Sequence, residues 1–111
     1  MEIEPALKYL RDNAQKLAKA HADKVYLEQF RKTKKALLMV EAEVAMGITV
    51  VSKQEVYAYA HPEYQELLDG LRVAVEEYER LKHLQITAQL KVDVWRSLNA
   101  NSRKEFENYG N

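Results

Sequence analysis

The stretch PEYQELLDGLRVAVEEYERLKHLQITAQLKVDVWRSLNANSRKEF, residues 62–106, decides the fold. It contains no proline after Pro62 and keeps one stripe of side chains at helical spacing. The members of the stripe, apolar or aromatic except Gln85 and Asn99, are Leu67, Leu71, Val75, Tyr78, Leu81, Gln85, Ala88, Val92, Trp95 and Asn99. This spacing predicts a helix over about residues 62–106, roughly 60 Å long at about 1.5 Å per residue. A chain of 111 residues cannot wrap a compact core around it, so a second helix must lie alongside, either from the same chain or from another chain.

A second long helix is predicted over about residues 4–46, because Pro5 suits a first helical turn and no breaker follows before Gly47. An apolar line with steps of mostly three or four residues runs along it: Leu7, Leu10, Ala14, Leu17, Ala18, Ala22, Tyr26, Phe30, Thr33, Leu37, Val40 and Val44. Consecutive four-residue steps between Ala18 and Phe30 make this line drift around the helix, unlike a strict heptad coil. We expect this line to be the buried face.

The segment between the long helices predicts a bend with a short helix. Ser52 followed by Glu55 matches a capping box, which predicts a helix over about residues 53–60, and Pro62 then starts the next helix. The sequence therefore predicts one all-α domain over residues 1–111, an antiparallel hairpin of two long helices with a short helix at the bend. Because two helices leave one side of each apolar stripe in water, we expect a dimer or higher oligomer of the chain.

Composition and charge restrict the function classes. The chain has 17 basic and 17 acidic residues, and this balance excludes a generally basic nucleic-acid coat. Residues 1–40 contain nine Lys or Arg against five Asp or Glu, whereas residues 41–111 contain eight against twelve. There is no cysteine, which excludes disulfide and thiolate chemistry and fits a reducing cytosol. No signal peptide or transmembrane-length run is visible, so we expect a cytoplasmic protein without a membrane partner.

A basic cluster beside two aromatic residues is the most suggestive local feature. Its members are Arg31, Lys32, Lys34 and Lys35, preceded by Tyr26 and Phe30. Cations beside aromatic rings favour nucleic-acid binding through phosphate charge and base stacking. The alternative is a paired helix face, because an antiparallel hairpin would bring the cluster opposite three acids, Glu76, Glu77 and Glu79.

Two aromatic groups are further candidates. Trp95 lies near three cations, Arg96, Arg103 and Lys104, and this combination is typical of partner-binding or nucleic-acid-binding surfaces; alternatively, Trp95 continues the buried stripe. The bend contains the tyrosines Tyr57, Tyr59 and Tyr64. They form either a recognition tip or a plug that closes the end of the hairpin.

The sequence lacks the signatures of an enzyme or a metal centre. Glu79 and His83 lie four residues apart, but two ligands do not make a site and no H-E-x-x-H pair exists. No P-loop, G-x-S-x-G or G-x-G-x-x-G motif is present. We therefore expect no catalytic residue, no metal and no cofactor. Gly70 lies inside the predicted second long helix, and a close helix crossing there would explain it.

Three segments carry a resemblance: YLEQFRKTKKALL at residues 26–38, YAYAHPEYQELLDGLRVAVEEYERLK at 57–82 and AQLKVDVWRSLNANSR at 88–103. In these segments the chain resembles small uncharacterised helical proteins of tailed bacteriophages and prophages, which look like products encoded near homologous-recombination and single-strand-annealing functions. The resemblance implies a bacterial host cytoplasm and a role around phage DNA metabolism. It carries over no functional residue.

Two functional hypotheses follow. The first is a non-enzymatic phage accessory protein in DNA recombination or replication, which binds a DNA-processing protein or binds DNA through the cations named above. The second is a protein-only adaptor or inhibitor of a host nuclease or defence factor, with four aromatic anchors, Tyr57, Tyr59, Tyr64 and Trp95.

Overall fold

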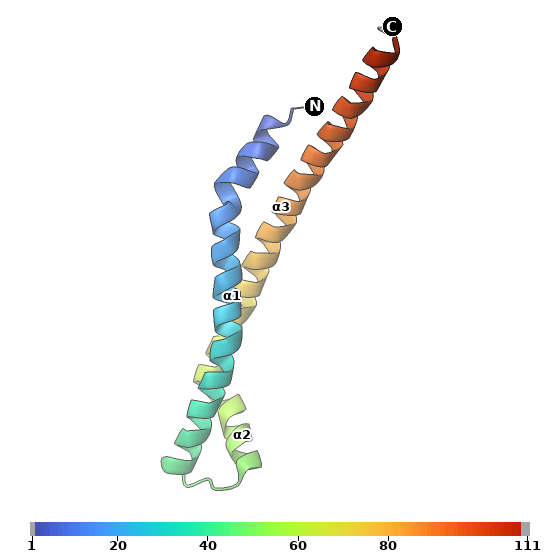
Figure 1. Ribbon diagram of the computed structural model, residues 1–111. Coiled ribbons are helices and arrows are strands. Elements are labelled where there is room, and N and C mark those ends of the chain that lie inside the picture. Colours follow the sequence, from blue (N-terminus) through green and yellow to red (C-terminus); the bar gives the residue numbers. More distant parts are fainter. Residues whose placement is uncertain (1, 110–111) are drawn as a thin grey trace. The chain divides into compact units, whose positions relative to one another are not determined.

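The chain is helical throughout nearly all of the part that the structure describes. The computed structural model describes residues 2–109, with side chains for residues 2–107. Its helices are α1 (Glu4–Val44), α2 (Val51–Ala60) and α3 (Pro62–Tyr109), and the described residues contain no strand (Figure 1). The all-helical prediction is confirmed. Met1, Gly110 and Asn111 of the predicted domain lie outside the described residues. None of the described helices is apolar over a length that would cross a membrane.

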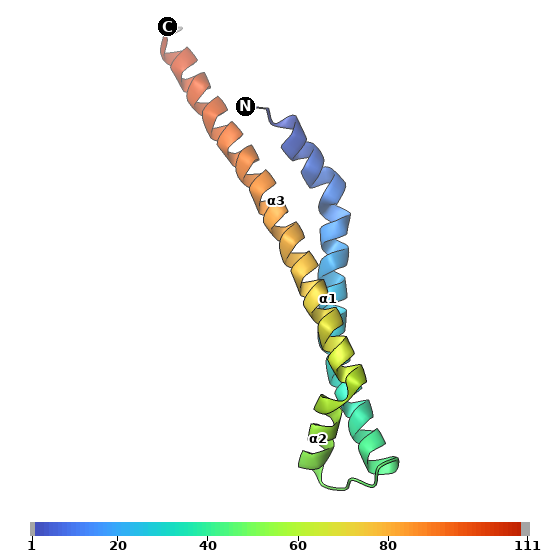
Figure 2. The ribbon, with the colours of Figure 1, turned by 180° about the vertical axis from the view of Figure 1, so that it is seen from behind.

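A left-handed glycine follows the end of α1. Gly47 has φ +68°, a backbone conformation that glycine adopts without the steric cost of a Cβ atom. The reversal brings the Ile48 N–H to the Ala42 carbonyl of the last helical turn, at 2.9 Å. Gly47 thus lets the chain leave α1 while the Ala42 carbonyl still accepts a hydrogen bond. In both views α2 lies beside this end of α1 (Figure 1, Figure 2).

The start of α2 differs from the predicted capping box. The N-cap is Val50, in extended conformation and without a capping side chain, so α2 begins at Val51 and Ser52 lies inside it. The Val50 carbonyl accepts from the N–H groups of Lys53 and Gln54 at 3.1 and 3.0 Å. The buried Gln54 side chain donates to the Ile48 carbonyl at 2.8 Å. This side-chain hydrogen bond fastens the helix to its loop, and Ser52 and Glu55 have no part in it.

His61 is both the last residue of the α2 turn and the cap of α3. Its backbone is extended, φ −66° and ψ 134°, because the following proline disfavours the helical conformation. Its carbonyl accepts from the N–H groups of Tyr64 and Gln65, and its Nδ1 accepts from the Glu63 N–H at 3.1 Å. One imidazole therefore satisfies a donor at the N-terminus of α3.

The chain divides into two compact units, each described by itself. Lys19–Tyr78 forms one unit, which we call the α2 unit. Its core contains Leu38, Ala58 and Tyr64, with Met39 and Leu68 packed against it. Ala58 of α2 is completely buried between Leu38 and Tyr64. The small core residue lets the short helix pack closely against α1 and α3.

The described residues of Met1–Ala18 and Glu79–Asn111 form the second unit, which we call the terminal unit. Its core contains Ala6 of α1 with Ala88 and Val92 of α3. Ile3, Tyr9 and Leu10 pack against this cluster. The predicted α3 stripe supplies both α3 members, so that part of the expected core is confirmed.

The predicted buried face of α1 is wrong in the α2 unit. Leu37 is 57% exposed, whereas its neighbour Leu38 is only 4% exposed. Tyr26, Val40 and Val44 of the predicted line are exposed as well. Successive residues of a helix point about 100° apart, so packing on Leu38 turns the predicted line away from the core. The cause is the packing of α2. The sequence predicted this helix but not the face of α1 that it covers, and Ala58 of α2 packs on Leu38.

Candidate functional site

Two members of the basic cluster form ion pairs in the α2 unit. The Lys34 ammonium lies 2.6 Å from the Glu63 carboxylate, and the Lys35 ammonium lies 3.6 Å from the Glu55 carboxylate. The expected acids Glu76, Glu77 and Glu79 are thus not the partners in these two pairs. The partner acids come instead from α2 and from the first turn of α3, which pack against this part of α1. Lys34 and Lys35 are therefore paired, with acids other than the three that the sequence suggested.

The other two cations of the cluster have no ion-pair partner among the described residues. Arg31 is half-buried, and Lys32 is exposed. Tyr26 and Phe30 stack on each other with ring centroids 5.9 Å apart and nearly parallel planes. Phe30 is half-buried, so Tyr26 presents the larger exposed ring.

The tyrosines of the bend have different environments. Tyr64 belongs to the core and is 7% exposed, which matches the plug interpretation for this residue. Tyr59 is exposed and meets the Tyr64 ring edge-on at 5.3 Å, with the Lys35 ammonium 4.8 Å from its own ring centre. A hydrogen bond with Tyr59 raises the pKa of Lys35, while desolvation opposes this rise and Glu55 adds to it. Tyr59 is therefore held between a cation and a core ring.

His61 and Tyr57 meet Glu41 of α1. The His61 Nε2 lies 3.4 Å from a Glu41 carboxylate oxygen, and the Tyr57 ring contacts the imidazole edge-on at 5.7 Å. Burial raises the pKa of the Tyr57 hydroxyl, and the Glu41 charge raises it further. The hydroxyl therefore stays protonated at neutral pH. A phenol with a raised pKa is a hydrogen-bond donor and a poor nucleophile, so this group holds α2 on α1.

The Lys34–Glu63 pair predicts an acid dependence of stability. Its hydrogen bond and charge lower the pKa of Glu63 below the ordinary value of 4.5. A lowered folded-state pKa contributes stability above the ordinary pKa, and this contribution is lost as the pH falls through the folded-state value. We expect urea unfolding midpoints of wild type and Glu63→Gln to differ at pH 7, and this difference to shrink as the pH falls below 4.5. In a Lys34→Gln background, Glu63→Gln should no longer change the unfolding midpoint at pH 7. A midpoint difference between wild type and Glu63→Gln that is the same at every pH would contradict this assignment.

The tail candidates belong to the terminal unit. Trp95 is half-buried on α3, and its carbonyl accepts from the Asn99 side chain at 2.8 Å. Arg96, Arg103 and Lys104 are exposed and have no ion-pair partner among the described residues. Trp95 therefore has both a packed and an accessible side, and it continues the stripe of Val92, which is 3% exposed.

Glu79 and His83 do approach each other, at 3.6 Å between carboxylate oxygen and Nε2. The described residues contain no group of three or more His, Cys, Asp or Glu side chains that could hold a metal ion. A structural zinc site needs four ligands and a catalytic one needs three, so this pair alone does not form either.

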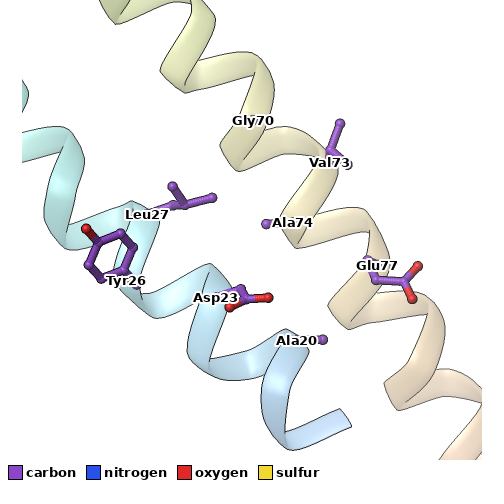
Figure 3. Close-up of a pocket in the computed structure, with 8 residues that line it drawn as sticks. All are labelled: Ala20, Asp23, Tyr26, Leu27, Gly70, Val73, Ala74 and Glu77. Atoms are coloured by element: carbon purple, nitrogen blue, oxygen red, sulfur yellow. The ribbon is translucent and has the colours of Figure 1, made fainter. Parts of the chain in front are cut away.

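An apolar groove of about 400 Å³ runs between α1 and α3 in the α2 unit. Figure 3 shows Leu27 of α1 and Ala74 of α3 pointing toward each other across it. Gly70 lines the groove, and a Cβ atom built there would meet nothing within 4 Å. The close crossing expected at Gly70 is therefore absent, because no backbone or side chain of another segment lies against it.

Gly70→Ala is accordingly expected to stabilise the protein by about 0.5–1 kcal/mol, since glycine in a helix interior costs this much relative to alanine. Chemical denaturation measures the change. The matched control is Gly47→Ala, which also meets no atom within 4 Å but has φ +68°, so it should destabilise by about 1–2 kcal/mol. A loss of stability in Gly70→Ala would show that the site is crowded.

The sequence analysis missed an apolar surface at the α1–α2 connection. Its members, which we call the apolar tip, are Met46, Val50, Val51 and Val56, and the exposed fractions are 59%, 49%, 61% and 68%. The sequence signal for this surface is the β-branched run at residues 48–51. Isolated exposed apolar residues are ordinary, but a group around one short loop is typical of an interaction site.

Comparison of the chain with protein-family models, with curated proteins and with solved structures finds no match.

Proposed function

We propose that the chain is a non-enzymatic helical adaptor that binds another protein through the apolar tip. In this proposal α1 and α3 form an antiparallel hairpin, α2 closes its bend, and copies of the chain associate. The proposal follows the second hypothesis of the sequence analysis, with the tip in place of the four aromatic anchors.

The exposure of the apolar tip carries the proposal. Its four side chains come from the loop and from α2, and the loop is fastened by the Gln54 hydrogen bond to Ile48. A preorganised apolar surface binds a partner with little loss of conformational entropy. The polar groups around α2, by contrast, are engaged with one another: Lys34 with Glu63, Lys35 with Glu55, and His61 with Glu41. These contacts hold α2 and its tip residues against α1 and α3.

Affinity capture from a bacterial lysate with matched variants tests the proposal. Val51→Ser and Val56→Ser together alter the tip, and Leu90→Ser alters an exposed leucine of the terminal unit as a control. We expect one stoichiometric protein that wild type and the control retain after nuclease treatment and that the tip variant loses. Equal capture by the tip variant, or loss of the captured protein on nuclease treatment, would contradict the proposal.

DNA binding in phage recombination or replication is the second candidate. Five of the seven predicted cations have no ion pair among the described residues, which favours their availability to phosphate: Arg31, Lys32, Arg96, Arg103 and Lys104. Fluorescence anisotropy with single-stranded and duplex DNA tests this. Binding that weakens steeply with salt and is lost in Lys32→Glu would support DNA binding; no binding at low salt would exclude it.

A further inference from the structure

We infer that two copies of the chain pair antiparallel along an exposed seam of α1, and that this pairing is the association included in the proposed function. The seam consists of Tyr26, Phe30, Thr33, Leu37, Val40 and Val44, all within the α2 unit. Its partner is the same seam of the second copy.

The spacing of the seam is that of a coiled coil. From Tyr26 to Val44 the steps are four, three, four, three and four residues, the pattern that places side chains on one line of a two-stranded coil. The consecutive four-residue steps of the predicted apolar line end at Phe30, so they overlap the seam only in its first step. None of the six side chains is charged.

The described residues of the chain leave this seam largely exposed, although Phe30 is half-buried. Tyr26 is 65% exposed, Leu37 and Val40 are each 57% exposed, and Val44 is 80% exposed. Leu38, on the adjacent face, is the residue that packs on α2 and α3. Because α1 uses one face for its own fold, a second apolar face with coil spacing remains for another helix.

The order of side chains favours the antiparallel direction. The step pattern is symmetric about residue 35, so a two-fold axis there brings Tyr26 opposite Val44 and Phe30 opposite Val40 of the second copy. Each layer then combines a large side chain with a small one, which fills space better than the two equal rings that a parallel pair would oppose.

Charge beside the seam also favours this direction. Lys32 and Glu43 lie on the same flank, are exposed and have no ion pair among the described residues. Antiparallel pairing brings Lys32 of one copy within about 8 Å along the axis of Glu43 of the other, whereas parallel pairing separates them by about 16 Å, at about 1.5 Å per residue. The two Lys34 side chains approach near the centre, but each is neutralised by its own Glu63.

The size of the contact predicts a weak dimer. The seam is about 27 Å long, or about five helical turns. Stable interfaces bury roughly 1,200–2,000 Å² in total, and two single helices of this length lie near the lower end of that range. We expect a dissociation constant on the order of 1–100 μM.

Sedimentation equilibrium of the full chain tests the seam. Wild type should be a concentration-dependent dimer, and Leu37→Glu should raise the dissociation constant at least about tenfold, by burying unpaired charge. The control is Val73→Glu, because Val73 is 57% exposed like Leu37 but lies on α3; it should dimerise as wild type does. Circular dichroism verifies that both variants remain folded. Equal dimerisation of Leu37→Glu and wild type would overturn the inference.

Disulfide trapping tests whether the two copies pair antiparallel. The chain contains no cysteine, so an introduced cysteine has no competing thiol. We expect oxidation to join a Phe30→Cys chain to a tagged Val40→Cys chain and to leave each variant unlinked when it is alone. Antiparallel pairing separates two Val40→Cys positions by about 15 Å along the axis, well beyond the roughly 7 Å limit for a disulfide. Parallel pairing would instead link each variant to itself and leave the mixture of the two variants without a mixed disulfide.

The outcomes separate this inference from the adaptor function. A dimer that persists in Leu37→Glu would show that the seam is not the interface and that the copies associate through another surface. A wild-type monomer at the highest soluble concentration removes the association altogether. Neither result changes the capture experiment on the apolar tip, because its variants, Val51→Ser and Val56→Ser, lie on α2 and outside the seam.

Discussion

Leu38→Ala is expected to lower the free energy of unfolding by about 2–4 kcal/mol, the usual cost of truncating a buried leucine and leaving a cavity. Leu38 is 4% exposed and shares its core with Ala58 and Tyr64. Because the truncation removes the side chain that α2 and α3 both contact, α2 should detach before the rest of the helices melt. Urea denaturation followed by circular dichroism, with hydrogen exchange at residues 51–60, measures both effects.

The neighbouring Leu37→Ala is the matched control, since Leu37 has the same chemistry on the exposed face of α1. At concentrations where the chain is monomeric it should change stability by no more than about 0.5 kcal/mol. If Leu37→Ala were the more harmful variant, the face predicted from the sequence would be the true core face, and the packing described for α2 would be wrong.

Val92→Asp is expected to be the second large effect, a loss of at least about 3 kcal/mol, because it combines lost apolar burial with an unpaired buried charge. Val92 is 3% exposed in the terminal unit, against Ala6 and Ala88. The first turns of α1 should lose their contact with α3. Hydrogen exchange at residues 4–18, together with Trp95 fluorescence, reports the change locally.

Val94→Asp serves as the comparison, since Val94 is two residues away and 46% exposed. A surface aspartate there should cost little, within about 0.5 kcal/mol of wild type. Equal damage by both substitutions would mean that Val94 also lies in a contact, for example with another copy.

Local rules determine most of the secondary structure. Pro5, Gly47 and Pro62 mark where helices begin or end, for reasons that depend only on the backbone of a few neighbouring residues. The α3 stripe was equally predictable where its apolar residues repeat without interruption, and Leu81, Ala88 and Val92 are buried as expected. The start of α2 was not, because a side-chain hydrogen bond from Gln54 to Ile48 replaced the expected cap.

The candidate sites were predictable only as residue types. The sequence indicated that cations and tyrosines gather near the bend, but pairing depends on which helix faces which. Lys34 could have met any acid within reach, and the position of α2 and α3 selected Glu63. The tip residues Val51 and Val56 were overlooked because an apolar residue in a short segment is equally compatible with burial and exposure.

The sequence by itself determined that the chain forms long helices with a short one between them, since helix boundaries and periodicity are local properties. Only the tertiary structure decided which face of α1 is buried. Two lines of residues lie about 100° apart on α1: the apolar line through Leu37, which periodicity predicts, and a line through Leu38 that also contains Arg31 and Lys34. Docking of Ala58 and Tyr64 on Leu38 selected one line and left the other in solvent.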